Sequence, residues 1–248
     1  MNLSEREELR LVLLRDASVG HFMWLDRWQV SYPQVIAVEC SAHEALNLQN
    51  QRLQAAIGHM LQDDPETGEV FNAGASEADF AQLEQLIQAK LPDDFKALYR
   101  VFNGQTDEAG YVFDGEEWLS LERMAEEWEV WKGLLDDGTF EDDDDEAENE
   151  DIDPEIKPVW WSPLWIPFTY DGSGNHLCLD LNPTSEGTYG QVIRMWHDDA
   201  ERSLEAKTFA DWVETYIRGM EEGLYVYSED YGGIFKKEDL IADEDGEY

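Results

Sequence analysis

The sequence predicts an α+β fold, in which helices pack against one face of an antiparallel sheet. Between residues 160 and 196, short apolar runs alternate with turns rich in Gly and Asn, as in a β-meander. On both sides of this segment, apolar residues recur every three to four positions, as in helices that bury one face. Ten Trp, ten Tyr and ten Phe supply bulky side chains for the core of a 248-residue chain.

Residues 1–70 are predicted to form a helical N-terminal extension. Residues 4–7 match a capping box, so we expect a helix that runs to about Arg15. The aromatic residues of 22–32 have helical spacing, and a second capping box at 41–44 opens a longer helix to about residue 62. We expect the extension to pack on the rest of the chain, because its aromatic face needs a partner surface.

The main domain is predicted to span residues 71–223 and to begin with two helices. The first starts at Ser76. Pro92 suits the first position of the second, because a proline lacks the N–H that would be unpaired there. Asn103 and Gly104 follow its apolar stripe, and Gly104 is expected to hold a left-handed C-terminal cap.

A third helix is expected from Leu121 to about Gly138, and an acidic loop follows it near residues 139–157. A run of like charge repels itself and has no apolar anchor, so the loop is predicted to be dispensable for folding. It is also the candidate surface for a partner. Its candidate contact residues are Asp142, Asp143, Asp144, Asp145, Glu146 and Glu148.

The meander is predicted to have three strands. Pro167 interrupts the first apolar run, which predicts an edge strand. Residues 176–181 alternate polar residues with leucines, the period of a half-buried strand, and residues 191–196 return as the third strand. Thr208 then caps a last helix that ends at Gly223. Residues 224–248 are read as an aromatic, then acidic, C-terminal tail.

The pieces of this pattern resemble, in order, the Smi/Knr cell-wall-regulator type of the SUKH superfamily. They are W-x-P-x-W-I-P-F, D-G-x-G-N, C-L-D-L and G-x-x-G-Q-V-I, a Leu-Pro helix leading to Asn-Gly, and a closing T-F-x-x-W helix. The motif residues are Pro92, Asn103, Gly104, Trp165, Pro167, Asp171, Gly172, Gly174, Gly190 and Trp212. The resemblance covers residues 76–222 and implies an α+β fold without a general catalytic signature. Many bacterial members resemble immunity proteins that neutralise toxins, whereas fungal members look like signalling scaffolds.

The formal net charge is −40, with 17 Lys and Arg against 57 Asp and Glu. Such a field repels phosphates, which disfavours nucleic acid and anionic membranes as partners and favours a basic protein. The competing explanation is solubility through self-repulsion. Neither cysteine lies in a C-x-x-C pair, and no leader or stretch of 18 apolar residues is present, so we expect a cytoplasmic protein. The oligomeric state stays open.

No catalytic, metal or cofactor motif is recognisable. The turn at 171–174 lacks the GK[ST] of a phosphate loop, and the acidic run lacks the spacing of a calcium loop. His176, Cys178 and His197 would have to converge from separate strands to bind a metal, so we predict no metal site and no cofactor. The spacing of the tryptophans favours core positions over an exposed recognition patch; they are Trp128, Trp131, Trp160, Trp161 and Trp165.

These observations predict a non-catalytic protein-binding module. The resemblance and the charge together favour an immunity protein that occupies the basic cleft of a nuclease-like or nucleotide-handling toxin. The alternative is a scaffold or regulator of the fungal cell-wall type. An enzyme is the third candidate, and no residue pattern supports it.

Overall fold

The computed structural model describes residues 9–14, 22–24, 35–40, 42–61, 70–107, 109–140 and 152–244. Its central sheet has four antiparallel strands in the order β11–β10–β9–β7. These strands are β7 (Trp165–Pro167), β9 (His176–Asp180), β10 (Gln191–Met195) and β11 (Arg202–Ala206). The α+β class and the meander are confirmed, with β7 at one edge of the sheet as Pro167 predicts.

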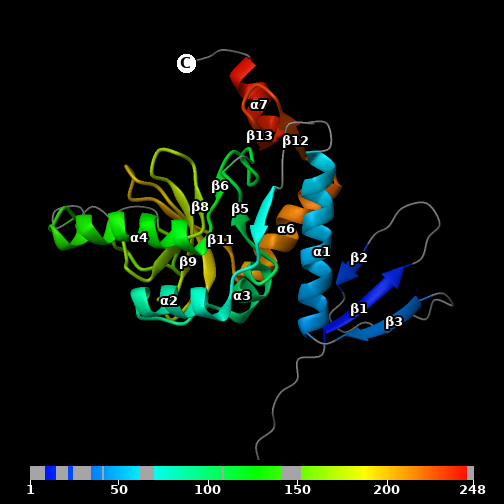
Figure 1. Cartoon of the computed structure of the whole chain (residues 1–248), viewed down its shortest axis with the longest axis horizontal. Coiled ribbons are helices and arrows are strands. Elements are labelled where there is room, and N and C mark those ends of the chain that lie inside the picture. The colour runs from blue at the N-terminus through cyan, green and yellow to red at the C-terminus, as the bar shows by residue number, and fades with distance from the viewer. Residues whose placement is uncertain are drawn as a thin grey trace, which may run out of the picture.

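Strand β9 is buried on both faces, whereas the sequence predicted a half-buried strand. Leu177 lines a small cavity with Trp212 of α6 (Phe209–Glu221). On the other face, Trp131 of α4 (Leu121–Asp136) donates a hydrogen bond to His176 at 3.2 Å. Helices therefore cover both faces of the sheet, and β9 and β11 lie between α4 and α6 in Figure 1. The expectation of helices on one face was wrong, because Trp131 of α4 covers His176 on the face of β9 opposite Leu177.

The core is built around Trp118, whose side chain is completely buried. Its indole N–H donates to Tyr99 Oη at 2.5 Å, and that hydroxyl donates to the carbonyl of Leu119 at 2.9 Å. Phe113 packs against Trp118 and against Trp212 of α6. Strand β6 (Glu117–Trp118), which pairs with β8 (Thr169–Tyr170), holds Trp118 beside the sheet. Aromatic residues thus join the helices to the sheet.

The helix predicted at 41–62 is confirmed as α1 (Ala42–Met60). The earlier helices were wrong, because β1 (Leu9–Leu14), β2 (Phe22–Trp24) and β3 (Val35–Cys40) form an antiparallel sheet. A run of leucines is compatible with either helix or strand, and pairing between distant segments decides for the strand. Residues 4–7, with the proposed first capping box, lie outside the described residues.

Helix α1 packs against the main domain rather than standing apart from it. Leu53 and Ile57 are fully buried in the common core. Arg52 binds two carboxylates of α6, with Nη1 2.8 Å from Glu214 and Nη2 2.8 Å from Glu221. Figure 1 shows α1 running alongside α6. The boundary at residue 70 stays a prediction.

Helices α2 (Glu77–Ile87) and α3 (Asp93–Tyr99) occur where apolar stripes predict them. The predicted C-terminal cap is misplaced, because α3 ends at Tyr99 and Gly104 lies in β5 (Phe102–Gln105). Strand β5 pairs with β4 (Phe71–Ala73). Gly104 does have a left-handed φ of +73°. However, Asn103 and Gly104 belong to a strand that pairs with β4, and not to the end of a helix.

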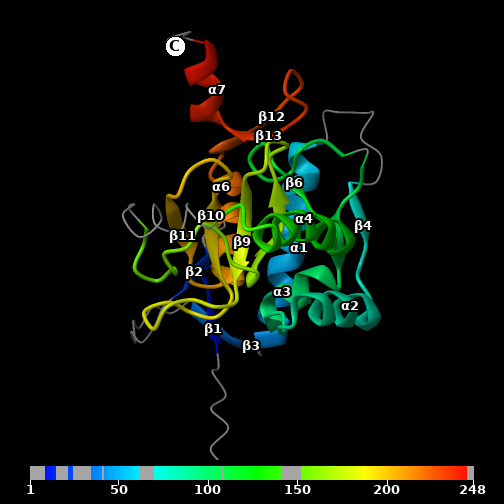
Figure 2. The same ribbon diagram turned by 90° about the vertical axis from the view of Figure 1, so that its left-hand side faces the viewer.

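The C-terminal segment carries regular structure. β12 (Tyr225–Ser228) and β13 (Gly233–Lys236) form a hairpin, and α7 (Lys237–Glu244) follows. Lys236 Nζ lies 3.0 Å from Asp114. In Figure 2 the hairpin and α7 project at the end of the molecule above β6. The acidic run and all six of its candidate contact residues fall outside the described residues.

Candidate functional site

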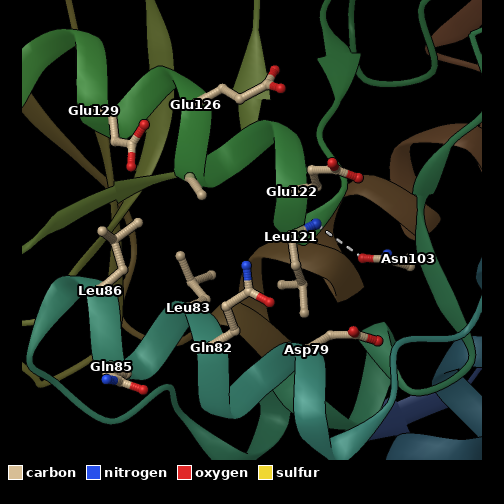
Figure 3. A pocket seen from close by; sticks show the side chains of 11 residues that line it. Asp79, Gln82, Leu83, Gln85, Leu86, Asn103, Leu121, Glu122, Glu126 and Glu129 are labelled. Atoms are coloured by element: carbon tan, nitrogen blue, oxygen red, sulfur yellow. Dashed lines mark hydrogen bonds between the residues drawn. The ribbon is translucent and has the colours of Figure 1, made fainter.

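A groove of about 810 Å³ lies between α2 and α4; we call it the α2–α4 groove (Figure 3). Its lining residues are Asp79, Gln82, Leu83, Gln85, Leu86, Asn103, Leu121, Glu122, Ala125, Glu126 and Glu129. Four of them are carboxylates, and none is Lys, Arg or His. The lining therefore suits a positively charged ligand.

Hydrogen bonds at the helix starts fix the two walls of the groove. Ser76 and Asp79 form a reciprocal capping box that begins α2. Ser120 caps α4, and the N–H of Leu121 donates to the side-chain oxygen of Asn103 at 3.0 Å. Figure 3 shows Asp79 near Leu121, so the beginnings of both helices lie at the same end. The motif residue Asn103 thus holds α4 against β5.

The groove has an apolar floor and an acidic rim. Leu83 and Leu121 are buried, and Leu86 and Ala125 are half-buried. Helical spacing places the rim residues of α4 on one face, because positions i, i+4 and i+7 lie on the same side of a helix. These rim residues are Glu122, Glu126 and Glu129, all exposed. An apolar floor beside a charged rim is the arrangement that an amphipathic ligand requires.

The rim carboxylates differ in their existing partners. Asp79 accepts hydrogen bonds from the backbone and side chain of Ser76, which lower the pKa of its carboxyl. Glu126 lies 2.7 Å from Arg123 Nη1. Among the described residues, Glu122 and Glu129 take part in no ion pair. These two carboxylates are therefore available to a partner.

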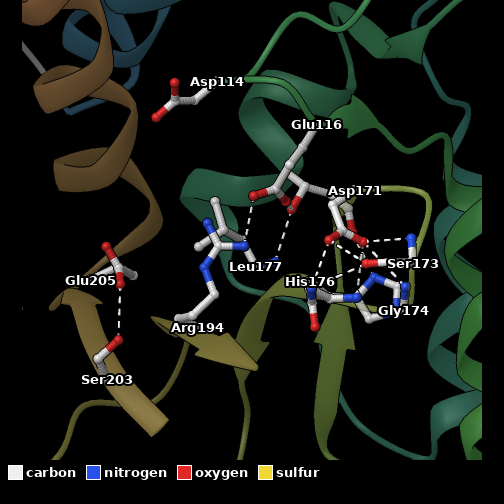
Figure 4. Close-up of polar contacts among 12 residues, drawn as sticks. Asp114, Glu116, Asp171, Ser173, Gly174, His176, Leu177, Arg194, Ser203 and Glu205 are labelled. Carbon is white, nitrogen blue, oxygen red and sulfur yellow. Dashed lines mark hydrogen bonds and ion pairs between the residues drawn. The ribbon is translucent and has the colours of Figure 1, made fainter. Parts of the chain in front are cut away.

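A second cavity, of about 180 Å³, lies between α6, β10 and the C-terminal hairpin. Both basic residues that line it already have carboxylate partners. Arg194 lies 2.6 Å from Glu116 (Figure 4), and Lys236 pairs with Asp114. Burial raises the pKa of Glu116, although Arg194 and the hydroxyl of Thr169 oppose that shift. Both basic side chains of this cavity are therefore already neutralised by carboxylates of the same fold.

The motif turn is closed by its own aspartate. One carboxylate oxygen of Asp171 accepts from the N–H groups of Ser173, Gly174 and Asn175 at 2.8, 3.1 and 3.0 Å. The N–H groups that a phosphate cradle would need are therefore already paired. This geometry agrees with a hairpin turn, in which Gly172 and Gly174 adopt positive φ.

The remaining motif residues have structural positions. Gly190 contacts the ring of Pro92, and a Cβ at Gly190 would lie 2.5 Å from Pro92 Cγ. This contact joins the start of α3 to the sheet. Trp165 and Pro167 are buried in β7, and Trp212 packs on the core from α6. None of these residues lines the α2–α4 groove.

Within the described part of the chain, no three His, Cys, Asp or Glu residues come together in a way that could hold a metal. His176 is buried, with Nδ1 2.7 Å from the carbonyl of Thr169 and Nε2 accepting from Trp131. Burial lowers its pKa. The ring Nδ1 of His197 hydrogen-bonds to the side-chain oxygen of Asn175 at 2.9 Å. Burial raises the pKa of the Cys178 thiol. Each residue thus has a local structural role.

The sequence profile of the SMI1 / KNR4 family (SUKH-1) matches residues 74–215, more than half of the chain. The chain belongs to this family. Among curated SMI1 / KNR4 relatives, "Cell wall biosynthesis/cell cycle regulator smi1" of Schizosaccharomyces pombe is 29% identical over 167 residues, 63% of this chain and 33% of that protein. "Glucan synthesis regulatory protein" of Neurospora crassa is 24% identical, over 67% of this chain and 37% of that protein.

"Cell wall assembly regulator SMI1" of Saccharomyces cerevisiae is 20% identical, over 69% of this chain and 40% of that protein. The alignments therefore span only about a third to two fifths of these SMI1 / KNR4 relatives. Their names describe regulators, which favours the regulator alternative over the immunity protein. In the part of the chain with a described structure, no helix is long and apolar enough to cross a membrane.

The α2–α4 groove was not predicted from the sequence. Its signal was present as Glu122, Glu126 and Glu129 at helical spacing beside Leu121 and Ala125. In an acidic chain such a stripe is indistinguishable from an ordinary solvated helix face. Only the position of α2 opposite this stripe makes it one wall of a groove.

Proposed function

We propose that the chain is a non-catalytic binding module of a regulatory protein, and that it acts by holding a basic partner protein. The observation that carries this proposal is the α2–α4 groove, with its apolar floor and its lining of four carboxylates without a basic residue. Membership of the SMI1 / KNR4 family supports a regulatory role. The names of its relatives point to cell-wall assembly or glucan synthesis as the process.

The charge supports a basic partner independently of the groove. A net charge of −40 attracts a positively charged surface over a distance set by the ionic strength and repels nucleic acid. Complementary charge mainly raises the rate of association, whereas a few desolvated contacts supply most of the affinity. A neutral or acidic partner would not be attracted by this negative charge.

The second candidate function is an immunity protein bound to a basic toxin, which the same charge would favour. The two functions predict different consequences of gene loss. Loss of a regulator should change the glucan content of the wall or its resistance to glucanase. Loss of an immunity protein should arrest growth only in cells that carry the cognate toxin.

The test of the proposed function is capture on the purified full chain followed by binding of the isolated partner. We expect a partner with a basic surface that binds the chain in a fixed stoichiometry and is recovered with unchanged mass. A partner that is cleaved or modified would contradict the non-catalytic role. If no protein binds the wild-type chain directly, the proposed function is wrong.

A further inference from the structure

We propose that the α2–α4 groove binds one amphipathic helix of the partner, with two Lys or Arg residues about seven positions apart; this inference rests on the proposed function. The groove could in principle accept an extended strand, a proline-rich segment or a helix. Its walls and its lining residues distinguish among these three.

The walls of the groove are two helices, whose backbone N–H and C=O groups bond within each helix. An extended peptide binds through backbone hydrogen bonds to an open sheet edge, which this groove does not offer. A proline-rich segment docks between aromatic side chains, and no aromatic residue lines the groove. A helix forms its backbone hydrogen bonds internally and needs only side-chain contacts with the groove, so it is the ligand that fits.

The charges of the rim set the pattern of the ligand. Glu122 and Glu129 are exposed and, in the described chain, unpaired. They are seven residues apart on α4, which corresponds to about 10 Å along the helix axis. A partner helix packed nearly parallel or antiparallel to α4 would place residues i and i+7 at the same spacing. Apolar residues between the two cations would contact Leu86 and Ala125, the half-buried part of the floor.

The probe is a synthetic helical peptide of about 16 residues, a length at which an Ala-rich helix begins to form. It carries two Lys seven positions apart, with Leu between them on the same face. Its isomer has the same composition but places the two Lys two positions apart, on opposite sides of the helix. Binding of both labelled peptides is measured by fluorescence anisotropy, which separates recognition of a pattern from attraction to charge.

The variant Glu122→Lys with Glu129→Lys reverses both rim charges. Its matched control is Glu186→Lys with Glu201→Lys, which changes the net charge equally at two exposed positions that do not line the groove. We expect the patterned peptide to bind wild type and control similarly and the groove variant about tenfold more weakly, since two ion pairs become repulsions. Circular dichroism and the thermal midpoint confirm that each variant is folded.

Equal binding of the two peptides to wild type, or equal binding of the patterned peptide to the groove and control variants, would overturn the inference. Its failure differs from that of the proposed function. If a natural partner binds the groove variant as tightly as wild type, then the groove is not its site but the proposed function stands. If no partner binds wild type, the proposed function fails first.

Discussion

Gly104 stands where the backbone of β5 meets the start of α4. A Cβ at this position would lie 2.5 Å from the nitrogen of Ser120 and 2.6 Å from the carbonyl carbon of Leu119. Both atoms belong to the backbone, so a side chain here displaces the chain that leads into α4. The close approach and the positive φ of +73° together make glycine necessary.

Gly104→Val is therefore expected to destabilise the protein by about 1–3 kcal/mol, because a β-branched residue resists positive φ and its Cβ would clash with backbone atoms. The measurement is urea denaturation followed by circular dichroism. The control is Gly58→Ala in α1, where no atom lies within 4 Å of the added Cβ. It should stabilise the helix by about 0.5–1 kcal/mol. An unchanged midpoint for Gly104→Val would contradict the close approach.

The contribution of Glu84 to the stability of the folded state depends on pH. Its burial acts to raise the pKa, but hydrogen bonds from Lys90, Lys96 and the N–H of Leu91 outweigh burial and lower it to about 2 from 4.5. A carboxylate with a lowered pKa stabilises the folded state fully above its unfolded pKa. That contribution is lost as the pH falls from about 5 towards 2.

Glu84→Gln is expected to lower the free energy of unfolding at pH 7 by about 1.5–3 kcal/mol, the usual contribution of a hydrogen bond to a charged group. The difference from wild type should shrink between pH 5 and pH 3, because wild type then loses the same contribution. Urea denaturation at several pH values measures both effects. Glu201→Gln, at an exposed position, should change stability by less than about 0.5 kcal/mol. A difference that stays constant with pH would show that the ion pairs are not responsible.

At the scale of elements, α1 joins the N-terminal sheet to the main domain. Asn50 donates to the carbonyl of Ala97 in α3 at 3.0 Å, and Arg52 pairs with α6. These contacts, together with the buried Leu53 and Ile57, make α1 part of the common core.

Leu53→Ala is expected to destabilise the whole domain by about 2–5 kcal/mol, because it leaves a cavity at a fully buried position. Gln54→Ala, at an exposed position of the same helix, is the control and should have little effect. Unfolding is followed by circular dichroism and by tryptophan fluorescence. A separate early transition, with the main transition unchanged, would show that α1 unfolds independently.

The acidic loop between α4 and β7 is predicted to be dispensable for folding. Replacing Asp142, Asp143, Asp144 and Asp145 by Ser removes like charges that repel one another and no apolar contact. We expect the thermal midpoint to shift by no more than about 2 °C, as for other surface substitutions. A fall of more than about 5 °C would show that the loop is structural. The role of these residues in partner binding stays a separate prediction.

For the whole molecule, the net charge of −40 predicts how binding responds to salt. Raising the salt concentration from about 0.05 to 0.5 M shortens the screening length about threefold. The association rate constant with a basic partner should fall by about tenfold or more, while the dissociation rate constant changes much less. Stopped-flow measurements of both constants test this expectation. An association rate that does not respond to salt would rule out electrostatic attraction.

Features that depend on near neighbours along the chain could be predicted from the sequence. The apolar stripes at 77–87 and 209–221 became helices, and the turn at 171–175 formed where Gly and Asn predict it. The ordered motifs also led to the correct family. Helix periodicity, capping and turns are encoded within a few residues, so they can be read directly from the chain.

Features that depend on partners far away in the sequence were fixed by tertiary packing. Leu9–Leu14 is a strand because Val35–Cys40 pairs with it, and no local signal excluded a helix. Strand β9 is buried on both faces because Trp131 and Trp212 reach it from helices far away in sequence. The acidic face of α4 became a groove only because α2 lies opposite. Spacing along a chain specifies which side of an element is apolar, but the surface that meets that side is fixed by the packing of the whole core.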